Sequence, residues 1–441
     1  MNEKRYETPE GSMTFTPLPD GTYRMSALTV GEPNRRYWEK NERGDIVWQA
    51  HPEPFTVPDG VSVIGHLRCP ILGEIILPEG VTRIDDLAFG AEFYASDTYE
   101  YYALHTVHLS QGLREIGYRA FFGCRALDGV HLPKGLTDIE SEAFYGCRSL
   151  SRITIPESVT HLGHGAFKNC SALREVIFRG ELEALNGYTF ENAASLVRVL
   201  LPKGLRAIVY ACFRGCTALT DLTLPDTLEE IHGAAFENCT SLTSLRFCRD
   251  LESGERMRRE PPFAGCTALT EFFLESSVRR ADWLPTAPAL TAIRVSPDHP
   301  TFVSIDGVLY SKDKRTLLRV PGGLTGPFTV PRGVTAIAPY ALCGCTGITA
   351  VSLPSSLRTV GEGAFRGMTA LTALSLPGKV SEVGKEALAD CTALTALHLP
   401  GSVCRIGEEL LRGCAALTSL TVSPANRHYR AEGTRLIPLG E

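Results

Sequence analysis

Apolar positions recur along most of the chain with a period of 23 residues. Between Leu150 and Cys170, the inward candidates Ile153 and Ile155 alternate with polar residues, and Pro156 follows them. Alternation with a period of two predicts a short strand with one buried face. Proline has no amide hydrogen to donate to a neighbouring strand, so the strand ends there. Each period therefore predicts one strand followed by a turn.

The second half of each period predicts another inward-facing segment and then a corner. Val159, Leu162 and the pair Ala166-Phe167 continue the apolar pattern as far as Cys170. In eleven periods the residue before this last position is Gly, Asn or Asp, the types that enter the left-handed backbone region most readily. A recurring corner with positive φ predicts a solenoid built coil by coil rather than separate globular domains. The eleven corner residues are Gly123, Gly146, Asn169, Asn192, Gly215, Asn238, Gly265, Gly344, Gly367, Asp390 and Gly413.

Nine of the fourteen cysteines follow the same period, and the cysteines do not predict a disulfide framework. One position of the period, here called the cysteine slot, holds cysteine in most coils but Ala193 and Met368 in two others. A slot that accepts Cys, Ala or Met requires a modest apolar side chain. We interpret the slot cysteines as buried, reduced thiols, although stacked coils would also bring them within disulfide range. They are Cys124, Cys147, Cys170, Cys216, Cys239, Cys266, Cys345, Cys391 and Cys414.

The repeat resembles the BspA-like (treponemal-type) class of bacterial leucine-rich repeats. That class follows L-x-x-[LIV]-x-[LIV]-P-x-x-[LIV]-x-x-I-x-x-x-A-F-x-x-C, and the resemblance extends from about Phe55 to Val422. It implies an α/β, β-rich leucine-rich repeat solenoid, a right-handed superhelix of about fourteen turns with a concave parallel β-sheet. One coil matches the pattern at Leu219, Leu222, Leu224, Pro225, Leu228, Ile231, Ala235, Phe236 and Cys239.

Interruptions of the period predict how the chain is organised. The region before the repeats contains a hairpin candidate around Asp20-Gly21, and a second hairpin candidate separates two blocks of repeats. Two insertions break the first block, near 90–103 and near 252–261, and the earlier one is rich in tyrosine. We expect an N-terminal cap at 1–54, a first block at 55–295, a β-hairpin insertion at 296–323, a second block at 324–422 and a C-terminal cap at 423–441.

Composition narrows the range of partners. Hydrophobic residues at 44% and charged residues at 21% are typical of a soluble folded protein. A net charge of −6 over 441 residues lacks the concentrated basic face of nucleic-acid-binding proteins. The sequence contains no run of eighteen apolar residues, so we do not expect membrane insertion. The first residues lack the apolar segment of a secretory signal. We therefore expect a cytoplasmic monomer. The resemblance implies the alternative, a bacterial cell-surface or secreted location.

No cluster of residues predicts catalysis, a metal site or a cofactor. In the register of the repeat His161 and His164 lie at outer positions whereas Cys170 lies inside, so their side chains should diverge. The pair Cys343-x-Cys345 lacks a second ligand pair at zinc spacing. Phosphate-binding loops and nucleophile elbows do not occur. We therefore expect a protein that is not an enzyme and that needs neither metal nor cofactor.

Outward positions of the strands supply the candidate ligand-binding surface on the concave face. In the first block they combine arginines with apolar side chains, as many protein interfaces do, although single outward apolar residues are also common on strands. In the second block the equivalent positions are small, as at Ala373 and Ser375. His108 and His131 lie outward one coil apart and predict sensitivity to mild acid. The ligand-binding candidates are Arg152, Ile177, Arg198, Leu200, Arg246, Phe273 and Arg294.

These features together predict a protein–protein interaction scaffold that binds an unidentified protein ligand. The resemblance implies an adhesin-like role, because members of that class often take part in adhesion at bacterial surfaces. Two alternatives remain. A carbohydrate- or cell-wall-binding module would use the tyrosine-rich insertion at 91–102. A structural spacer would have no specific ligand at all.

Overall fold

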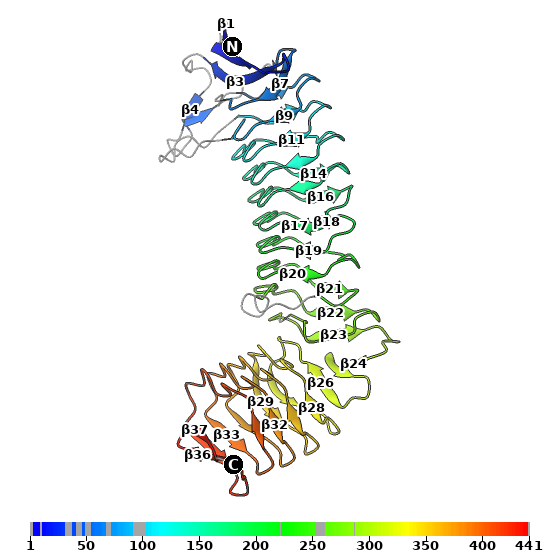
Figure 1. The fold of residues 1–441 in the computed structure, drawn as a ribbon, viewed down its shortest axis with the longest axis vertical. Helices are drawn as coiled ribbons and strands as arrows, with labels where there is room; N and C mark the ends of the chain where they lie inside the picture. Colours follow the sequence, from blue (N-terminus) through cyan, green and yellow to red (C-terminus); the bar gives the residue numbers. More distant parts are fainter. Residues whose placement is uncertain are drawn as a thin grey trace. The chain divides into compact units, whose positions relative to one another are not determined.

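A computed structural model describes residues 3–8, 11–30, 38–40, 46–48, 54–67, 72–90, 103–220, 222–251, 261–285 and 287–439. These residues form a β-solenoid of stacked coils joined by parallel strand pairs (Figure 1). The chain divides into two compact units, Met1–Leu242 (unit 1) and Thr243–Glu441 (unit 2). The described ranges contain strands and turns but no helix, so the predicted solenoid is present and its expected α component is not. The insertions at 91–102 and 252–260 lie outside the described residues.

Most coils of unit 1 contribute two short strands that pair with their counterparts in neighbouring coils, and among the described residues the coil of β20 contributes only the second. The first strands end at the proline position, and the second strands carry the inward residue that precedes the corners. We call the two surfaces they form the first-strand face and the second-strand face. The first strands are β6 (Phe55–Thr56), β8 (Glu74–Ile76), β10 (Thr106–His108), β12 (Gly129–Val130), β14 (Arg152–Ile155), β16 (Glu175–Phe178) and β18 (Arg198–Leu200). The second strands are β7 (Val61–Ile64), β9 (Arg83–Ile84), β11 (Glu115–Ile116), β13 (Asp138–Ile139), β15 (His161–Leu162), β17 (Ala184–Leu185), β19 (Ala207–Ile208) and β20 (Glu230–Ile231).

The first-strand ladder is interrupted, whereas sequence alone predicted one continuous sheet. Strand β12 pairs with β10 but not with β14, and β14 begins a separate three-stranded sheet with β16 and β18. The second strands remain paired past this point, because β13 pairs with β15. The coils therefore separate on one face while they stay joined on the other.

The interior of unit 1 contains two columns of side chains at fixed positions. Phenylalanine rings stack from coil to coil, and the centroids of Phe121 and Phe144 are 5.0 Å apart with the rings 5° from parallel. Beside them the slot cysteines are buried, and Cys170 Sγ donates to the carbonyl of Phe144 at 3.1 Å. Each thiol thus satisfies a carbonyl of the preceding coil. The stacked rings are Phe89, Phe121, Phe144, Phe167, Phe190, Phe213 and Phe236.

The predicted corner is confirmed in all eleven coils, where φ lies between 59° at Asn192 and 76° at Gly413. A second left-handed corner lies five residues before the cysteine slot. Residues of many types occupy it, including Glu142 at φ 55° and Tyr188 at φ 62°. Their amides donate to the next coil, as Glu142 N does to His164 O at 2.8 Å. Closing the coil and pairing it with its neighbour therefore outweighs the local preference of these residues.

Two antiparallel strands precede the first coil and join its second-strand ladder. Strands β2 (Gly11–Pro17) and β3 (Tyr23–Val30) form a hairpin whose turn includes Gly21 at φ 85°. Strand β3 then pairs in parallel with β7. The hairpin covers the open end of that ladder, with β1 (Lys4–Thr8) as the outer strand. Strands β4 (Trp38–Lys40) and β5 (Ile46–Trp48) form a further antiparallel pair.

Unit 2 begins with three parallel first strands and continues through an antiparallel module into regular coils. The module joins the second-strand ladder through the parallel pair β26–β28, so it is part of the solenoid. The three first strands are β21 (Ser244–Phe247), β22 (Glu271–Leu274) and β23 (Ala292–Val295), and the module is β24 (Phe302–Ile305), β25 (Val308–Ser311) and β26 (Thr316–Arg319). The coils contain β27 (Gly326–Thr329), β28 (Ala336–Ile337), β29 (Ile348–Ser352), β30 (Thr359–Val360), β31 (Ala373–Ser375), β32 (Glu382–Val383), β33 (Ala396–Leu399), β34 (Arg405–Ile406) and β35 (Ser419–Val422), and the chain ends with the hairpin β36 (Tyr429–Glu432) and β37 (Arg435–Pro438).

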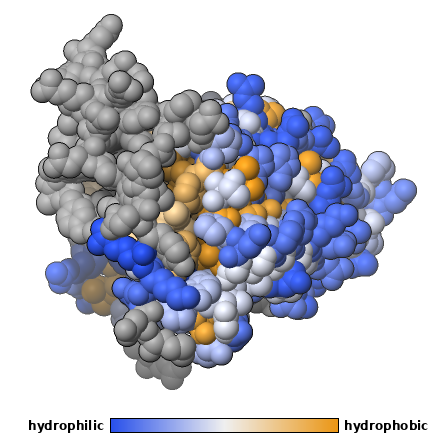
Figure 2. Space-filling model, turned by 90° about the horizontal axis from the view of Figure 1, so that it is seen from above, coloured by the Kyte–Doolittle hydropathy of each residue, from blue (hydrophilic) through white to orange (hydrophobic). Residues whose placement is uncertain are grey.

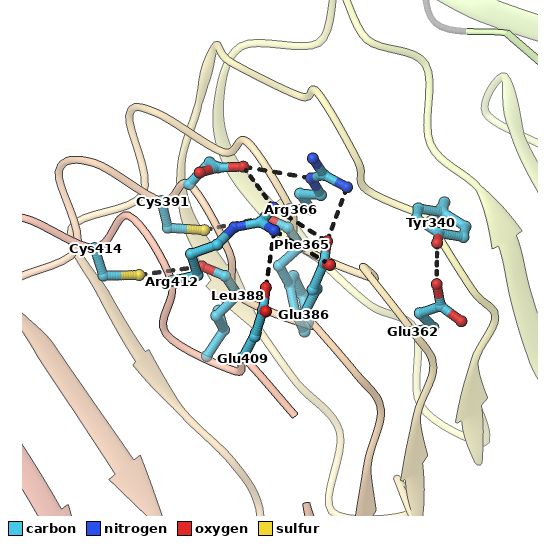
Figure 3. A network of polar contacts seen from close by, with 11 residues as sticks. Tyr340, Glu362, Phe365, Arg366, Glu386, Leu388, Cys391, Glu409, Arg412 and Cys414 are labelled. Atoms are coloured by element: carbon cyan, nitrogen blue, oxygen red, sulfur yellow. Dashed lines mark hydrogen bonds and ion pairs between the residues drawn. The ribbon is translucent and has the colours of Figure 1, made fainter. Parts of the chain in front are cut away.

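The cysteine column continues in the coils of unit 2. Cys391 and Cys414 each donate to a carbonyl of the preceding coil at 3.1 Å (Figure 3). None of the thirteen cysteines within the described ranges forms a disulfide bond. Burial raises the pKa of Cys391 to about 12, and it raises that of Cys170 to about 12 as well. These thiols are therefore protonated, unreactive parts of the interior.

Candidate protein-binding surface

The first-strand face of β14, β16 and β18 brings four of the predicted residues together. The strands alternate between buried and exposed side chains, so Ile153, Val176 and Val199 point inward. Arg152, Glu175 and Arg198 lie opposite one another in register at one outward position. Thr154, Ile177 and Leu200 occupy the other outward position. We refer to these six outward residues together with Val197 as the arginine–leucine patch.

The charged half of the arginine–leucine patch is one carboxylate between two guanidinium groups. Arg152 Nε lies 2.9 Å from Glu175 Oε2, and Arg198 Nη1 lies 3.3 Å from Glu175 Oε1. The arginine side chains are 73% and 71% exposed, whereas that of Glu175 is 20% exposed. The group therefore carries one excess positive charge on two guanidinium planes that remain open to solvent. Exposed pairs of this kind contribute only ~0–1 kcal/mol each to folding, so the arginines are not needed for stability.

The apolar half lies mainly on β18 and just before it. Leu200 is 49% exposed and Val197 is 46% exposed, while Ile177 is only half-buried by its neighbours. Sequence analysis missed Val197, because the equivalent residues Ser151, Arg174 and Thr220 are polar. Two large apolar side chains therefore face solvent beside two open guanidinium groups.

A hollow of about 590 Å³ adjoins the arginine–leucine patch where the ladder between β12 and β14 is interrupted. Gly129 contributes no side chain at the outward position that Arg152 occupies one coil later, which leaves the space open. His131, Lys134, Glu157 and Arg179 line it. Among the described residues these four side chains have no hydrogen-bond or ion-pair partner. The hollow thus offers both charge signs to a ligand. Sequence analysis missed the hollow, because it arises from a missing strand pairing as well as from Gly129.

The other three predicted residues lie on the first-strand face of unit 2 and are occupied by internal contacts. The guanidinium of Arg246 lies 4.2 Å from the centroid of Phe273 and also pairs with Glu275. Arg294 pairs with Glu271 on the neighbouring strand. Phe273 is half-buried rather than exposed, since an arginine covers its ring. The structure therefore separates the seven predicted residues into one group in each unit.

Later coils of unit 2 present small or polar side chains at the same outward positions. Ala373 and Ser375 on β31 lie in register with Ala396 and His398 on β33, and Ser419 and Thr421 follow on β35. The arginine–leucine patch has no counterpart on these three strands. Seen from above, the described surface is mostly hydrophilic, with apolar atoms exposed between hydrophilic ones (Figure 2).

The described part of the chain shows neither a metal site nor a membrane-spanning helix. No group of three His, Cys, Asp or Glu side chains there is arranged to hold a metal ion. His161 lies 3.7 Å from Glu140 on the outer surface, while Cys170 is buried, so these residues diverge as expected. Within the same ranges no helix could cross a bilayer. The tyrosines of the 91–102 insertion lie outside the described residues.

Comparison with known protein families identifies the same repeat that the sequence pattern predicted. The family model described as "BspA type Leucine rich repeat region" matches residues 92–216, 183–283 and 325–430, in six copies. The matched segments together span more than half of the chain. A search of curated proteins finds no significant match.

Among solved structures, the chain is similar to a leucine-rich repeat protein from Bacteroides ovatus. That match has 24% identity and a TM-score of 0.59, and it covers 95% of each chain. A leucine-rich cell surface protein from Faecalibacterium prausnitzii matches with 21% identity and a TM-score of 0.33 over 96% of each chain. The first of these supports the fold.

Proposed function

Because the chain belongs to the BspA-type leucine-rich repeat family, we propose that it is a protein-interaction scaffold. We propose further that it binds its protein ligand through the arginine–leucine patch. The observation that carries this proposal is the pair of exposed apolar side chains, Leu200 and Val197, beside two open arginines. Arginine and large apolar groups supply a disproportionate share of binding energy at protein interfaces.

The arrangement suits binding because the strands are rigid before a ligand arrives. Ladder hydrogen bonds fix β14, β16 and β18, so little backbone freedom is lost on association. Leu200 would enter an apolar pocket of the ligand, and the planar guanidinium groups of Arg152 and Arg198 would pair with its carboxylates. The adjoining hollow would admit a projecting segment of the same ligand. Arg246, Phe273 and Arg294 remain secondary candidates in unit 2.

A crosslinking experiment tests directly whether the ligand binds at the arginine–leucine patch. A photoreactive phenylalanine analogue replaces Leu200 in one sample and Ser375, an equivalent outward residue on β31, in a matched control. We expect one protein from the native host to become crosslinked at position 200 and not at position 375. Equal crosslinking at both positions would contradict the proposed surface.

Affinity measurements with the captured protein complete the test. The variant Arg198→Glu/Leu200→Asp should bind it at least about tenfold more weakly than the wild type, because it reverses a charge and buries another. The control Ser375→Asp/His398→Glu should retain wild-type affinity. Circular dichroism confirms that both variants fold. Binding to glycans that survives both variants would instead favour the carbohydrate alternative.

An adhesin-like role, the monomeric state and the cellular location are also proposals. The cytoplasmic location expected from the sequence has no support from the fold or the relatives. The surface location is the alternative. Fractionation of the native host and sedimentation of the purified chain distinguish these possibilities.

A further inference from the structure

Two hairpins of unit 2 leave a preceding coil through equivalent four-residue segments. Ser296-Pro297-Asp298-His299 leads into the hairpin of β24 and β25, and Ser423-Pro424-Ala425-Asn426 leads into the hairpin of β36 and β37. The two segments differ in their last residue, His299 in one and Asn426 in the other. Both of these side chains are buried. Each side chain accepts backbone N–H groups at the start of its hairpin, one through an imidazole and the other through an amide.

Asn426 joins its hairpin to the coil below through four hydrogen bonds. Its Oδ1 accepts the backbone N–H groups of His428 and Tyr429, each at 2.8 Å. Its Nδ2 donates to the carbonyls of Pro400 and Val403, each at 3.0 Å. The amide therefore accepts from the hairpin and donates to the coil. An amide does not titrate, so this joint is the same at any physiological pH.

His299 occupies the same place with an imidazole. Its Nδ1 accepts the backbone N–H groups of Phe302 at 3.1 Å and Thr301 at 3.3 Å, the counterparts of Tyr429 and His428. A nitrogen that accepts two N–H groups carries no proton, so the proton of the neutral ring is on Nε2. The ring also stacks on Phe302 with centroids 4.7 Å apart. Only this neutral tautomer fits the joint.

The other ring nitrogen faces the coil below. Nε2 lies toward the backbone of Glu275 and Val278, which correspond to Pro400 and Val403 at the second joint. Within the described ranges it is buried and has no hydrogen bond of normal geometry. The imidazole therefore accepts the same two backbone N–H groups as Asn426 does. Its Nε2 faces the equivalent carbonyls but makes no hydrogen bond of normal geometry with them.

Charges around the ring oppose its protonation. The pKa of His299 is lowered mainly by burial, and the positive charges of Lys312 and Arg279 lower it further. The carboxylate of Glu275, whose backbone lies beside the ring, is already occupied by Ser296 and Arg246. Protonation would place a hydrogen on Nδ1 directly against the N–H groups of Thr301 and Phe302. The protonated ring therefore has to leave the joint.

We propose that His299 makes the attachment of the β24–β25 hairpin acid-sensitive, whereas Asn426 keeps the C-terminal hairpin insensitive to pH. The folded state takes up a proton less readily than the unfolded state does, so stability rises with pH. The contribution of the joint is complete above the unfolded pKa of about 6.5. It is lost progressively as the pH falls from there toward the lower folded value. Mild acid would release the hairpin before the surrounding coils unfold.

Hydrogen exchange of the full chain tests the proposal, with the C-terminal hairpin as an internal reference. Between pH 7.5 and 5.0, after correction for intrinsic rates, amides of residues 299–311 should exchange on the order of tenfold faster. Amides of residues 426–438 should not change. In His299→Asn the change at 299–311 should disappear, and in Asn426→His a similar change should appear at 426–438. Wild-type exchange at 299–311 that is independent of pH, or a change that persists in His299→Asn, would overturn the proposal.

A second measurement uses the wild-type protein alone and does not depend on a variant folding. Nitrogen-15 spectra of histidine-labelled protein report which ring nitrogen carries the proton. We expect one histidine that stays in the Nε2–H tautomer, and that titrates below the exposed histidines and together with the change in exchange. A protonated Nδ1 on His299 at pH 7.5 would refute the proposed joint.

Discussion

The coils of unit 1 and the later coils of unit 2 place different side chains in the same interior position. In unit 1 a column of phenylalanine rings stacks through seven coils at centroid separations from 5.0 to 5.8 Å. In unit 2 the equivalent residues are Leu342, Phe365, Leu388 and Leu411. The coils close with either residue, so the position requires apolar volume rather than aromatic stacking.

Outward positions differ far more between the two regions. The outer edge of unit 1 carries cations over aromatic rings beside its ion pairs, and Lys168, for example, lies 4.9 Å from the Tyr188 ring centroid and also pairs with Glu191. The equivalent edge of unit 2 carries a network of ion pairs in which Arg366 and Arg412 both reach Glu386 (Figure 3). The same two arginines also pair with Asp390. Because the interior repeats while the exterior varies between the two regions, we expect binding specificity to depend on the exterior side chains. Four changes separate the contributions of the two regions.

The largest effect is expected from emptying the phenylalanine column. Phe167→Ala should lower the free energy of unfolding by ~3–5 kcal/mol, because a buried ring is lost and a cavity remains. Phe167→Leu, which installs the residue found in unit 2, should cost less than half as much. Denaturant unfolding followed by circular dichroism measures both. If the leucine variant were as unstable as the alanine variant, stacking itself would be required in unit 1.

A smaller effect is expected at the outer edge of unit 1, where a carboxylate is buried. Glu191 is 3% exposed and accepts from Arg214 Nε at 2.7 Å, with Lys168 Nζ also 2.6 Å away. Arg214→Ala should cost ~1.5–3 kcal/mol, since it removes a charged hydrogen bond to a buried group. Arg412→Ala in unit 2 is the matched control, because Arg412 is 42% exposed and its pairs contribute ~0–1 kcal/mol. Equal losses in thermal melts would show that burial does not distinguish the two edges.

A third change tests whether the corner has the same cost in both regions. Gly146 and Gly367 have φ of 72° and 71°, and a methyl group at either would meet only ordinary contacts. Changing either one to Ala should therefore cost ~1–2 kcal/mol through backbone conformation alone. Gly378→Ala provides the control, because Gly378 lies in open space without a positive φ. A cost at Gly378 as large as at Gly146 would point to a source other than the corner.

The smallest effect is expected in the cysteine slot. Cys170→Ala installs the residue that Ala193 supplies in the next coil, so the loss should be about 1 kcal/mol. The same change at Cys414, which is only half-buried in the last regular coil, should cost less. Thermal melts compare the two variants. A larger loss at Cys414 would contradict the view that the slot contributes through burial.

The fold was predictable because the same inward-facing apolar positions recur from one period of the repeat to the next. The strand alternation, the proline stop and the corner at positions such as Asn169 all have local physical causes that are visible in residue types. The second corner was missed because Glu142 and Tyr188 give no local sign of positive φ. The expected helical component came from the resemblance and is absent from the described residues.

The candidate site was predictable only in outline. Register identified the outward positions of Arg152, Arg198 and Leu200 correctly, since a two-residue period determines which side chains point out. Exposure depends on neighbours, so Phe273 was wrongly expected to be open and Val197 was overlooked. The hollow beside β12 depends on a strand pairing that does not form, and Gly129 alone did not reveal that absence.

The left-handed corner occupied by residues other than glycine has a consequence for engineering this array. Among the described residues, nine coils hold such a residue at the second corner, and two already hold glycine there, Gly165 and Gly363. Replacing one residue with glycine relieves a backbone cost of ~1–2 kcal/mol and adds a flexibility cost of ~0.5–1 kcal/mol. The difference is small for any one coil but adds along the array. Glycine therefore offers a graded way to raise thermal tolerance at corners such as Ala211 and Ala234, whose side chains make no ion pair or ring contact.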